Sequence, residues 1–323
     1  MAKSKTTTST KNPPKPPREP MLSPAARRRV IHALAAFIVI VAAGSGLYVL
    51  KRHVSRDLTY VIDPPRVVLK NRPVWMGDYL ATQIVRSVRP TGGHSAADKQ
   101  VLEDTYAALQ RNPWVHQVHQ VRRVYGEQPG DTIEIDCDFR APIALVKWGI
   151  YYWLVDGNGV KLPEQYTADL VPKIVLDQNK RPAIRIIEGV KLPPPETGNP
   201  WHGDDLHAAL DMIKLLYGRP FADDIVKVDV TNIAGRVDGR EAQVVLVTKW
   251  DTQVRWGRPV NAKDFIIEAP VARKLQGLQD VYAQYKRVDA GKPWIDVRFD
   301  KITHPVSTPA PTPPAGASAN VTP

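Results

Sequence analysis

Two groups of polar side chains have spacings that could support metal binding or acid–base chemistry. His116 and His119 stand three residues apart, and the second group, near the expected start of a helix, comprises His202, Asp204, Asp205 and His207. On a strand, residues three apart point to opposite faces unless a bulge realigns them. An aspartate at a helix start serves more simply as an N-cap. We therefore expect no metal or cofactor site, and we predict a helix capped by Asp204 or Asp205.

The other residues that could carry chemistry fit structural roles. Asp156–Gly159 looks like the beginning of a calcium loop, but the twelfth position of such a loop would be Thr167 rather than glutamate; the run is also a strong hairpin signal. The lone Cys137 lies on the apolar face of an alternating strand, which indicates a small buried side chain. Because the sequence contains no nucleophile-elbow, P-loop or zinc-protease motif, we expect no enzymatic activity and no small-molecule substrate.

A long apolar run near the N-terminus predicts a transmembrane helix. Val30–Leu50 has no formally charged side chain, and as a helix it would be about 31 Å long, enough to cross a bilayer. The basic residues that flank it are Arg27, Arg28, Arg29, Lys51 and Arg52. The positive-inside rule then places residues 1–29 in the cytoplasm and the bulk of the chain outside it. A signal peptide cleaved near Ala42–Ser45 fits less well, because the apolar run continues to Leu50.

The net charge of +11 is divided unevenly along the chain. Residues 1–29 hold eight Lys and Arg against one Glu, whereas the outer region is close to neutral. The charge therefore indicates membrane topology rather than a nucleic-acid partner. Both ends, residues 1–29 and 304–323, are rich in proline and predict disordered tails, because they can bury too little apolar surface to offset the entropy of ordering.

Residues 58–139 predict the order strand, helix, helix, strand, strand. The expected elements are a strand at Leu58–Leu69, a helix at Val74–Val88, a helix that ends at Asn112-Pro113, and strands at Trp114–Tyr125 and Thr132–Arg140. In Trp114–Tyr125 a valine recurs every third residue instead of every second. This spacing predicts an extra residue and a β-bulge near His119-Gln120.

Residues 140–303 predict a domain made mainly of strands, with helices at Asp205–Tyr217 and Pro270–Val288. The expected strands are Ile143–Trp148, Tyr151–Val155, Val171–Leu176, Ala183–Ile187, Ile225–Thr231, Gln243–Trp250, Thr252–Trp256 and Trp294–Ile302. In the last of these, Ile295, Val297 and Phe299 alternate with polar residues, which is typical of a half-buried strand. The pattern as a whole indicates an α+β protein.

Taken in order, several of these segments resemble the FtsQ/DivIB family of bacterial cell-division proteins. The resemblance rests on Asn112-Pro113-Trp114-Val115, Arg140-Ala141-Pro142, Ala144, Trp148, Leu154–Gly159, Arg273-Lys274-Leu275 and Trp294–Phe299. It implies a single-pass protein of the bacterial inner (cytoplasmic) membrane. The transmembrane helix (30–50) would be followed by a POTRA-like βααββ domain (58–139) and a mainly antiparallel β domain with two helices (140–303). The segment 178–201 and the prolines soon after the last strand depart from the family's pattern.

The same resemblance implies a non-enzymatic scaffold. It would bind small single-span partners similar to FtsB and FtsL by strand addition at the last strand, and link them to septal peptidoglycan synthesis. The candidate partner-binding residues, assigned by position, are Arg298, Phe299, Asp300 and Lys301. Two alternatives stay open: a POTRA-type envelope scaffold for secretion or outer-membrane assembly, and an anchored envelope enzyme that depends on His202 or His207.

Overall fold

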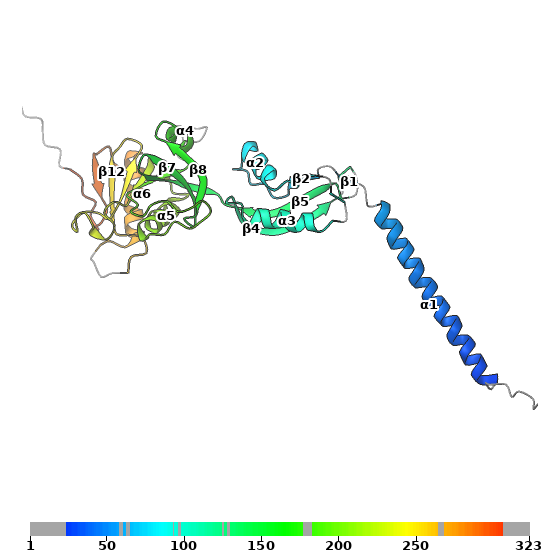
Figure 1. Ribbon diagram of the computed structural model, residues 1–323. Helices are drawn as coiled ribbons and strands as arrows, with labels where there is room; N and C mark the ends of the chain where they lie inside the picture. Colours follow the sequence, from blue (N-terminus) through cyan, green and yellow to red (C-terminus); the bar gives the residue numbers. More distant parts are fainter. Residues whose placement is uncertain are drawn as a thin grey trace, which may run out of the picture. The chain divides into compact units, whose positions relative to one another are not determined.

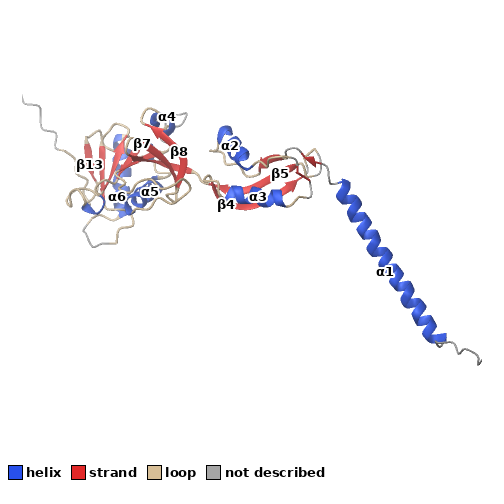
Figure 2. Ribbon diagram, in the orientation of Figure 1, coloured by secondary structure: helices blue, strands red, loops and turns tan. Residues whose placement is uncertain are grey.

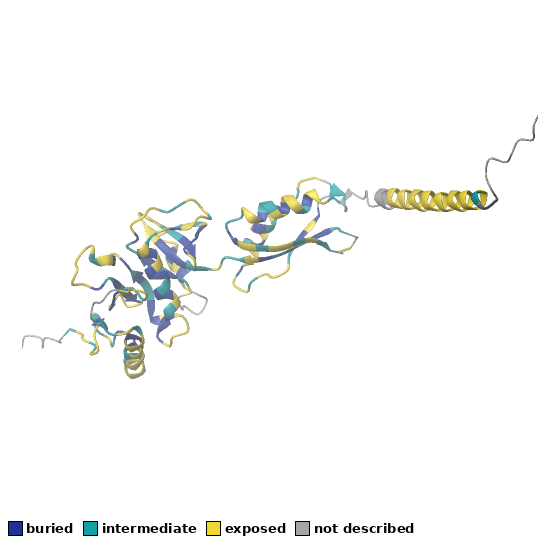
Figure 3. Ribbon diagram, turned by 90° about the horizontal axis from the view of Figure 1, so that it is seen from below, coloured by how far each residue is buried: buried dark blue, intermediate teal, exposed yellow. Residues whose placement is uncertain are grey.

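The computed structural model describes residues 24–57, 61–62, 65–92, 94–95, 98–124, 126–127, 130–176, 183–263 and 268–305. The predicted tails lie outside these ranges except at residues 24–29 and 304–305. Helix α1 (Pro24–Asp57) contains the predicted span (Figure 1). Among the described helices it is the one that is long and apolar enough to cross a membrane, over Ala26–His53, and residues 27–53 of it are exposed (Figure 3). Arg27–Arg29, Lys51 and Arg52 lie on α1 and are exposed.

The contacts within the chain separate this helical part from the rest, and the two are described separately. The part that contains α1 also contains β1 (Val61–Ile62), and the boundary between the two parts falls within the short strand β3 (His94–Ser95). The other part has two larger sheets, of three and eight strands, shown in red in Figure 2.

The three-stranded sheet has the element order that the sequence predicts. Its elements are β2 (Arg66–Leu69), α2 (Asp78–Val88), α3 (Gln100–Gln110), β4 (Val115–Val124) and β5 (Thr132–Phe139). The central strand β5 runs parallel to β2 and antiparallel to β4. On its inner face Ile133, Ile135 and Cys137 are buried, as their alternation predicts. Burial raises the pKa of the Cys137 thiol to about 12, with Asp136 and Asp138 adding to the shift, so this cysteine stays protonated at neutral pH.

The valine repeat in β4 is accommodated by two bulges. The pairing with β5 skips one residue between Val115 and Gln117 and another between Val118 and Gln120. One extra residue, His116 or His119, therefore lies in each bulge, and Val115, Val118 and Val121 remain on the side of the sheet that contacts the core. The predicted bulge near His119 is confirmed, and the second one, at His116, was not predicted.

The eight-stranded sheet is mixed. Its strands, in chain order, are β6 (Pro142–Trp148), β7 (Tyr151–Asp156), β8 (Lys161–Thr167), β9 (Arg185–Glu188), β10 (Ile225–Asp229), β11 (Val244–Thr248), β12 (Gln253–Gly257) and β13 (Trp294–Asp296). They lie side by side in the order β13-β12-β11-β10-β9-β6-β7-β8. The pairs β6–β9, β9–β10 and β12–β13 are parallel and the other four are antiparallel. The expectation of a mainly antiparallel sheet therefore holds for four of the seven pairings. The pairs β9–β10 and β12–β13 are parallel because a helix connects the two strands of each pair.

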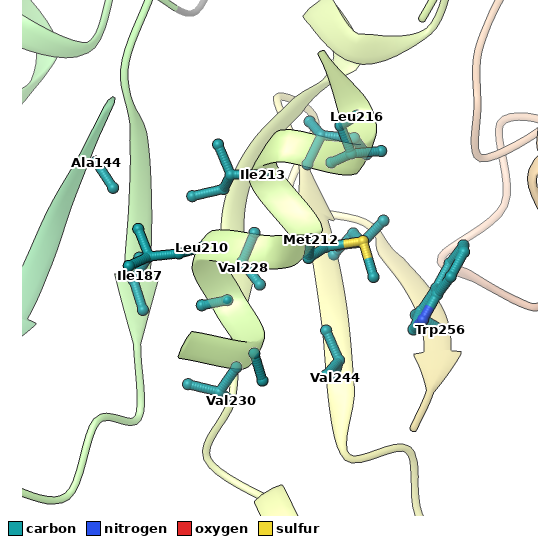
Figure 4. Close-up of a cluster of buried hydrophobic side chains, with 14 of the residues drawn as sticks. Ala144, Ile187, Leu210, Met212, Ile213, Leu216, Val228, Val230, Val244 and Trp256 are labelled. Carbon is teal, nitrogen blue, oxygen red and sulfur yellow. The ribbon is translucent and has the colours of Figure 1, made fainter. Parts of the chain in front are cut away.

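Both long helices of this domain occur where the sequence predicts them. Helix α5 (Asp204–Leu216) packs Leu210, Met212 and Ile213 against Ile187, Val228 and Val244 of the sheet (Figure 4). Helix α6 (Val271–Tyr285) buries Leu275 and Leu278 in the same core.

Two strand predictions were wrong in this domain. Val171–Leu176 forms the short helix α4 (Val171–Val175), because Pro172 lacks an N–H for a strand ladder and fits the first helical turn. Strand β8 was not predicted, since Pro163 interrupts its apolar pattern.

Candidate interaction edge at the end of the chain

Strand β13 lies at one edge of the eight-stranded sheet. The Gln253 N–H donates to the Pro293 carbonyl at 3.0 Å, and the Val297 N–H donates to the Arg255 carbonyl at 3.1 Å. Pro293 and Val297 thus point their backbone groups toward β12. In a parallel pair these directions alternate along the strand, so Trp294 and Asp296 present their N–H and C=O groups to the outside. These two residues form the outer edge of the sheet.

The chain leaves this edge sooner than the sequence predicts. The expected strand Trp294–Ile302 ends at Asp296, and the next residues bend back until Thr303 pairs with Asp296. The Asp296 N–H donates to the Thr303 carbonyl at 2.8 Å and the Thr303 N–H donates to the Asp296 carbonyl at 3.1 Å. The cause is an aspartate turn, because the Asp296 carboxylate accepts the Arg298 backbone N–H at 3.0 Å. We call residues 298–303 the terminal strap.

Arg298, predicted to contact a partner, instead holds the strap in place. Its guanidinium lies 2.7 Å from the buried Asp296 carboxylate and donates to the Arg240 carbonyl at 2.7 Å. The side chain is 14% exposed, and the hydrogen bond to Asp296 is the main cause that raises its pKa. Most hydrogen-bonding groups of the Arg298 side chain are therefore already bound within the chain, and few are left for a partner.

The other three predicted contact residues are on the surface. Phe299 is 52% exposed, and Asp300 and Lys301 are exposed beside it. The Arg298 guanidinium carbon lies 5.6 Å from the centre of the Phe299 ring, within the range of a cation–π contact. The structure thus brings Phe299, Asp300 and Lys301 together on the bend of the strap, and not on a strand.

A buried ion pair supports the edge from behind. Lys274 on α6 is 4% exposed, and its ammonium donates to the Trp256 carbonyl at 2.8 Å and to the Glu268 carboxylate at 2.5 Å. Burial is the largest influence on Lys274 and lowers its pKa, against the opposing effect of Glu268. Gly257 makes room for the pair: its φ is +99°, and a Cβ there would overlap the Glu268 carboxylate. Sequence patterns could not show this pair, since it joins residues from three separate elements.

A narrow groove runs between α6 and the strap. Its volume is about 170 Å³, and its lining includes Arg273, Gly277 and Val281 on the helix and Val297, Phe299 and Ile302 on the other side. Ile302 packs against Gly277, where an added Cβ would lie 3.0 Å from the isoleucine Cδ1.

The opposite edge of this sheet, β8, is covered by the chain itself. The Lys161 N–H donates to the Asn199 carbonyl at 3.1 Å, and the Lys161 carbonyl accepts from the Gly198 N–H at 2.8 Å. Pro163 further along has no N–H to offer. Gly198 and Asn199 belong to the segment 178–201, so the described part of this segment covers the start of β8.

The histidine and aspartate groups do not form a metal site. In the described residues there is no group of three or more His, Cys, Asp or Glu side chains that could hold a metal ion. His119 makes a 2.9 Å ion pair with Asp138, while His202 and His207 are exposed.

The predicted aspartate cap at the start of α5 is wrong, because Gly203 occupies the cap position. Asp204 and Asp205 lie in the first turn, where negative charge is favourable. Asp205 is buried and lies 3.0 Å from the Arg236 guanidinium, and it also accepts the Lys191 N–H at 2.9 Å. Its role is therefore structural.

Some of the residues on which the predicted resemblance rests lie at Asp156 or in an apolar cluster with Trp114. The Asp156 carboxylate accepts the N–H groups of Asn158 and Val160 at 2.8 Å, which forms the predicted turn between β7 and β8. Its other oxygen lies 2.8 Å from the Arg140 guanidinium. Trp114, from the Asn112-Pro113-Trp114 run, is buried in one apolar cluster with Leu145, Leu154 and Leu162. These residues join the three-stranded sheet region to the start of the eight-stranded sheet.

No protein-family model matches this chain, and no curated protein sequence matches it at a significant level.

Proposed function

We propose that this protein is a membrane-anchored scaffold for cell division, of the type represented by FtsQ and DivIB. Residues 58–139 act in this proposal as a POTRA-like domain, and α1 holds the chain in the bacterial inner membrane with its N-terminus in the cytoplasm. The order of elements in the three-stranded sheet region and the contacts around Asp156 support the proposal. Its partners are FtsB- and FtsL-like single-span proteins.

One observation carries the proposal: the last strand of the chain is an edge strand with outward backbone groups. Among the described residues, nothing pairs with the outward N–H and C=O of Trp294. A strand from a partner can add to such an edge through main-chain hydrogen bonds, and the side chains next to it then provide selectivity. Phe299, Asp300 and Lys301 lie close in sequence to this edge and are exposed.

The direct test is to capture the full-length protein from its own membranes in mild detergent and identify what co-purifies. We expect FtsB- or FtsL-like proteins from the same cell. Recovery of secreted chains or outer-membrane barrels instead would favour an envelope scaffold for secretion or assembly.

The topology is tested separately with intact spheroplasts. External protease should digest the chain beyond Leu50 and leave residues 1–29 protected, as the distribution of Arg27–Arg29 requires. Protection of the region beyond Leu50 would contradict the orientation and, with it, an extracytoplasmic partner site.

A further inference from the structure

The terminal strap occupies part of the edge that the proposed function assigns to a partner. Asp296 is one of the two residues of β13 whose backbone points outward, and both of its backbone groups are already bonded to Thr303. We propose that the strap is a competing strand, which closes the β13 edge until a partner strand displaces it. This inference rests on the proposed function and adds a means of regulating it.

The closed position is held at the two ends of the strap, while its middle is exposed. At the first end the Arg298 guanidinium binds the Asp296 carboxylate and the Arg240 carbonyl. Thr303 contributes the two backbone hydrogen bonds to Asp296, and Ile302 packs against Gly277 on α6. The Arg298 carbonyl accepts the Ala269 N–H at 2.7 Å. Lys301, between these anchors, is exposed and belongs to no strand or helix. Segments with few buried contacts open at low cost in free energy.

The sequence favours a second position for the same segment. Ile295, Val297 and Phe299 continue one apolar alternation past the point where β13 ends, which is the pattern of a longer strand. In the closed position Phe299 breaks this pattern, because it is half exposed.

The groove between α6 and the strap gives Phe299 a place in the open position. The groove is lined by Val297, Val281 and Gly277, and Phe299 already forms part of its wall. If the strap straightens, Phe299 follows Val297 onto the inner face of the sheet. The backbone of Asp296 then becomes free for a partner, and the side chains of Arg298 and Asp300 face outward.

A reversible cross-link tests this competition. An ideal Cβ at Gly277 lies 3.6 Å from the Ile302 Cγ1, so the pair Gly277→Cys and Ile302→Cys can form a disulfide with a small adjustment. Cys137 is buried and will not interfere. The probe is the purified extracytoplasmic part of the FtsB-like protein from the same genome, bound to the full-length chain in detergent. We expect oxidation to weaken binding at least about tenfold and a reductant to restore it. Ile302→Cys alone should not respond to oxidant.

Truncation tests the opposite direction. A chain that ends at Lys301 lacks the Thr303 pairing, whereas a matched chain that ends at Pro305 keeps it and loses only the proline-rich tail. If the strap is closed in about nine of ten molecules, the first truncation should tighten binding about tenfold and the second should leave it unchanged. Thermal unfolding measured on both chains shows whether each still folds.

The outcomes separate the two proposals. Equal affinity in the oxidised, reduced and truncated forms would overturn the strap as a competitor and leave the scaffold proposal standing. Absence of binding in every form, with folding intact, would overturn strand pairing with this partner class and the strap's role together.

Discussion

Two sheet edges in this protein are protected from unwanted pairing in different ways. Strand β4 is ten residues long and, among the described strands, pairs on one side only, with β5, but two bulges interrupt its regular backbone. Strand β13 is three residues long and regular, and its outer side is half covered by the strap. Bulges are permanent features of a backbone, whereas a short self-paired segment can be displaced. In the proposed scaffold, the edge assigned to a partner is therefore the one whose protection can be removed.

The largest expected effect concerns the support of the β13 edge. Lys274→Ala would remove the ammonium from the Glu268 carboxylate, which is 13% exposed and keeps the Arg258 N–H as a donor, at a cost of about 2 kcal/mol in the free energy of unfolding. Denaturant titration of the full-length protein in detergent measures this cost. The double variant Lys274→Met, Glu268→Gln should recover much of it, because no charge then stays unpaired. A loss below about 1 kcal/mol in the single variant would mean that the edge does not depend on this pair.

The core behind β4 and β5 should show a pH dependence that comes from Cys137. The thiol pKa rises from 9.0 to about 12 on folding, so between these values the unfolded chain loses the proton and the folded chain retains it. Stability should therefore fall with rising pH, by about 1.4 kcal/mol for each unit above 9. Cys137→Ala removes this contribution. The free energies of unfolding of the two proteins, compared at pH 8 and at pH 10, measure it. An equal pH dependence of the free energy of unfolding in both proteins would contradict the burial of the thiol.

The smallest effect on stability is expected at the β4 edge itself. Deletion of His116 and His119 removes both extra residues, so Val115, Val118 and Val121 would alternate regularly with polar residues. We expect the free energy of unfolding to change by less than about 1 kcal/mol and the protein to self-associate through the straightened edge. Light scattering over a concentration series detects this. A variant with His116→Ala and His119→Ala keeps the bulges and should remain like the unchanged protein; self-association of both variants would show that the bulges are not the protection.

Local patterns in the sequence predicted much of the fold. The order of the three-stranded sheet region, helices α5 and α6, the turn at Asp156 and the bulge near His119 all follow from spacing, turn residues and periodicity. Two of the strand predictions that were wrong have a common cause. The end of β13 is set by the side chain of Asp296, and the helical form of α4 by Pro172, so single residues outweighed the periodic pattern.

The candidate site was predicted less well than the fold. Position in the sequence predicted four contact residues near the end of the chain, but not which of them are already bound within the fold. Arg298 is committed to Asp296, and the outward groups belong to Trp294 and Asp296. The pairing of Thr303 with Asp296 and the ion pair of Lys274 with Glu268 depend on how irregular segments bend back on a strand and a helix, which periodicity does not report.

The most direct test of the account compares Trp294→Pro with Trp294→Ala. Both variants remove the indole ring, but only proline removes the outward N–H, and it leaves the bonds to β12 in place because those come from Pro293, Ile295 and Val297. Affinity for the FtsB-like partner is measured for both full-length variants. The account predicts that the proline variant binds about tenfold more weakly than the alanine variant, with equal thermal stability. Equal affinity of the two variants would contradict strand pairing at the β13 edge.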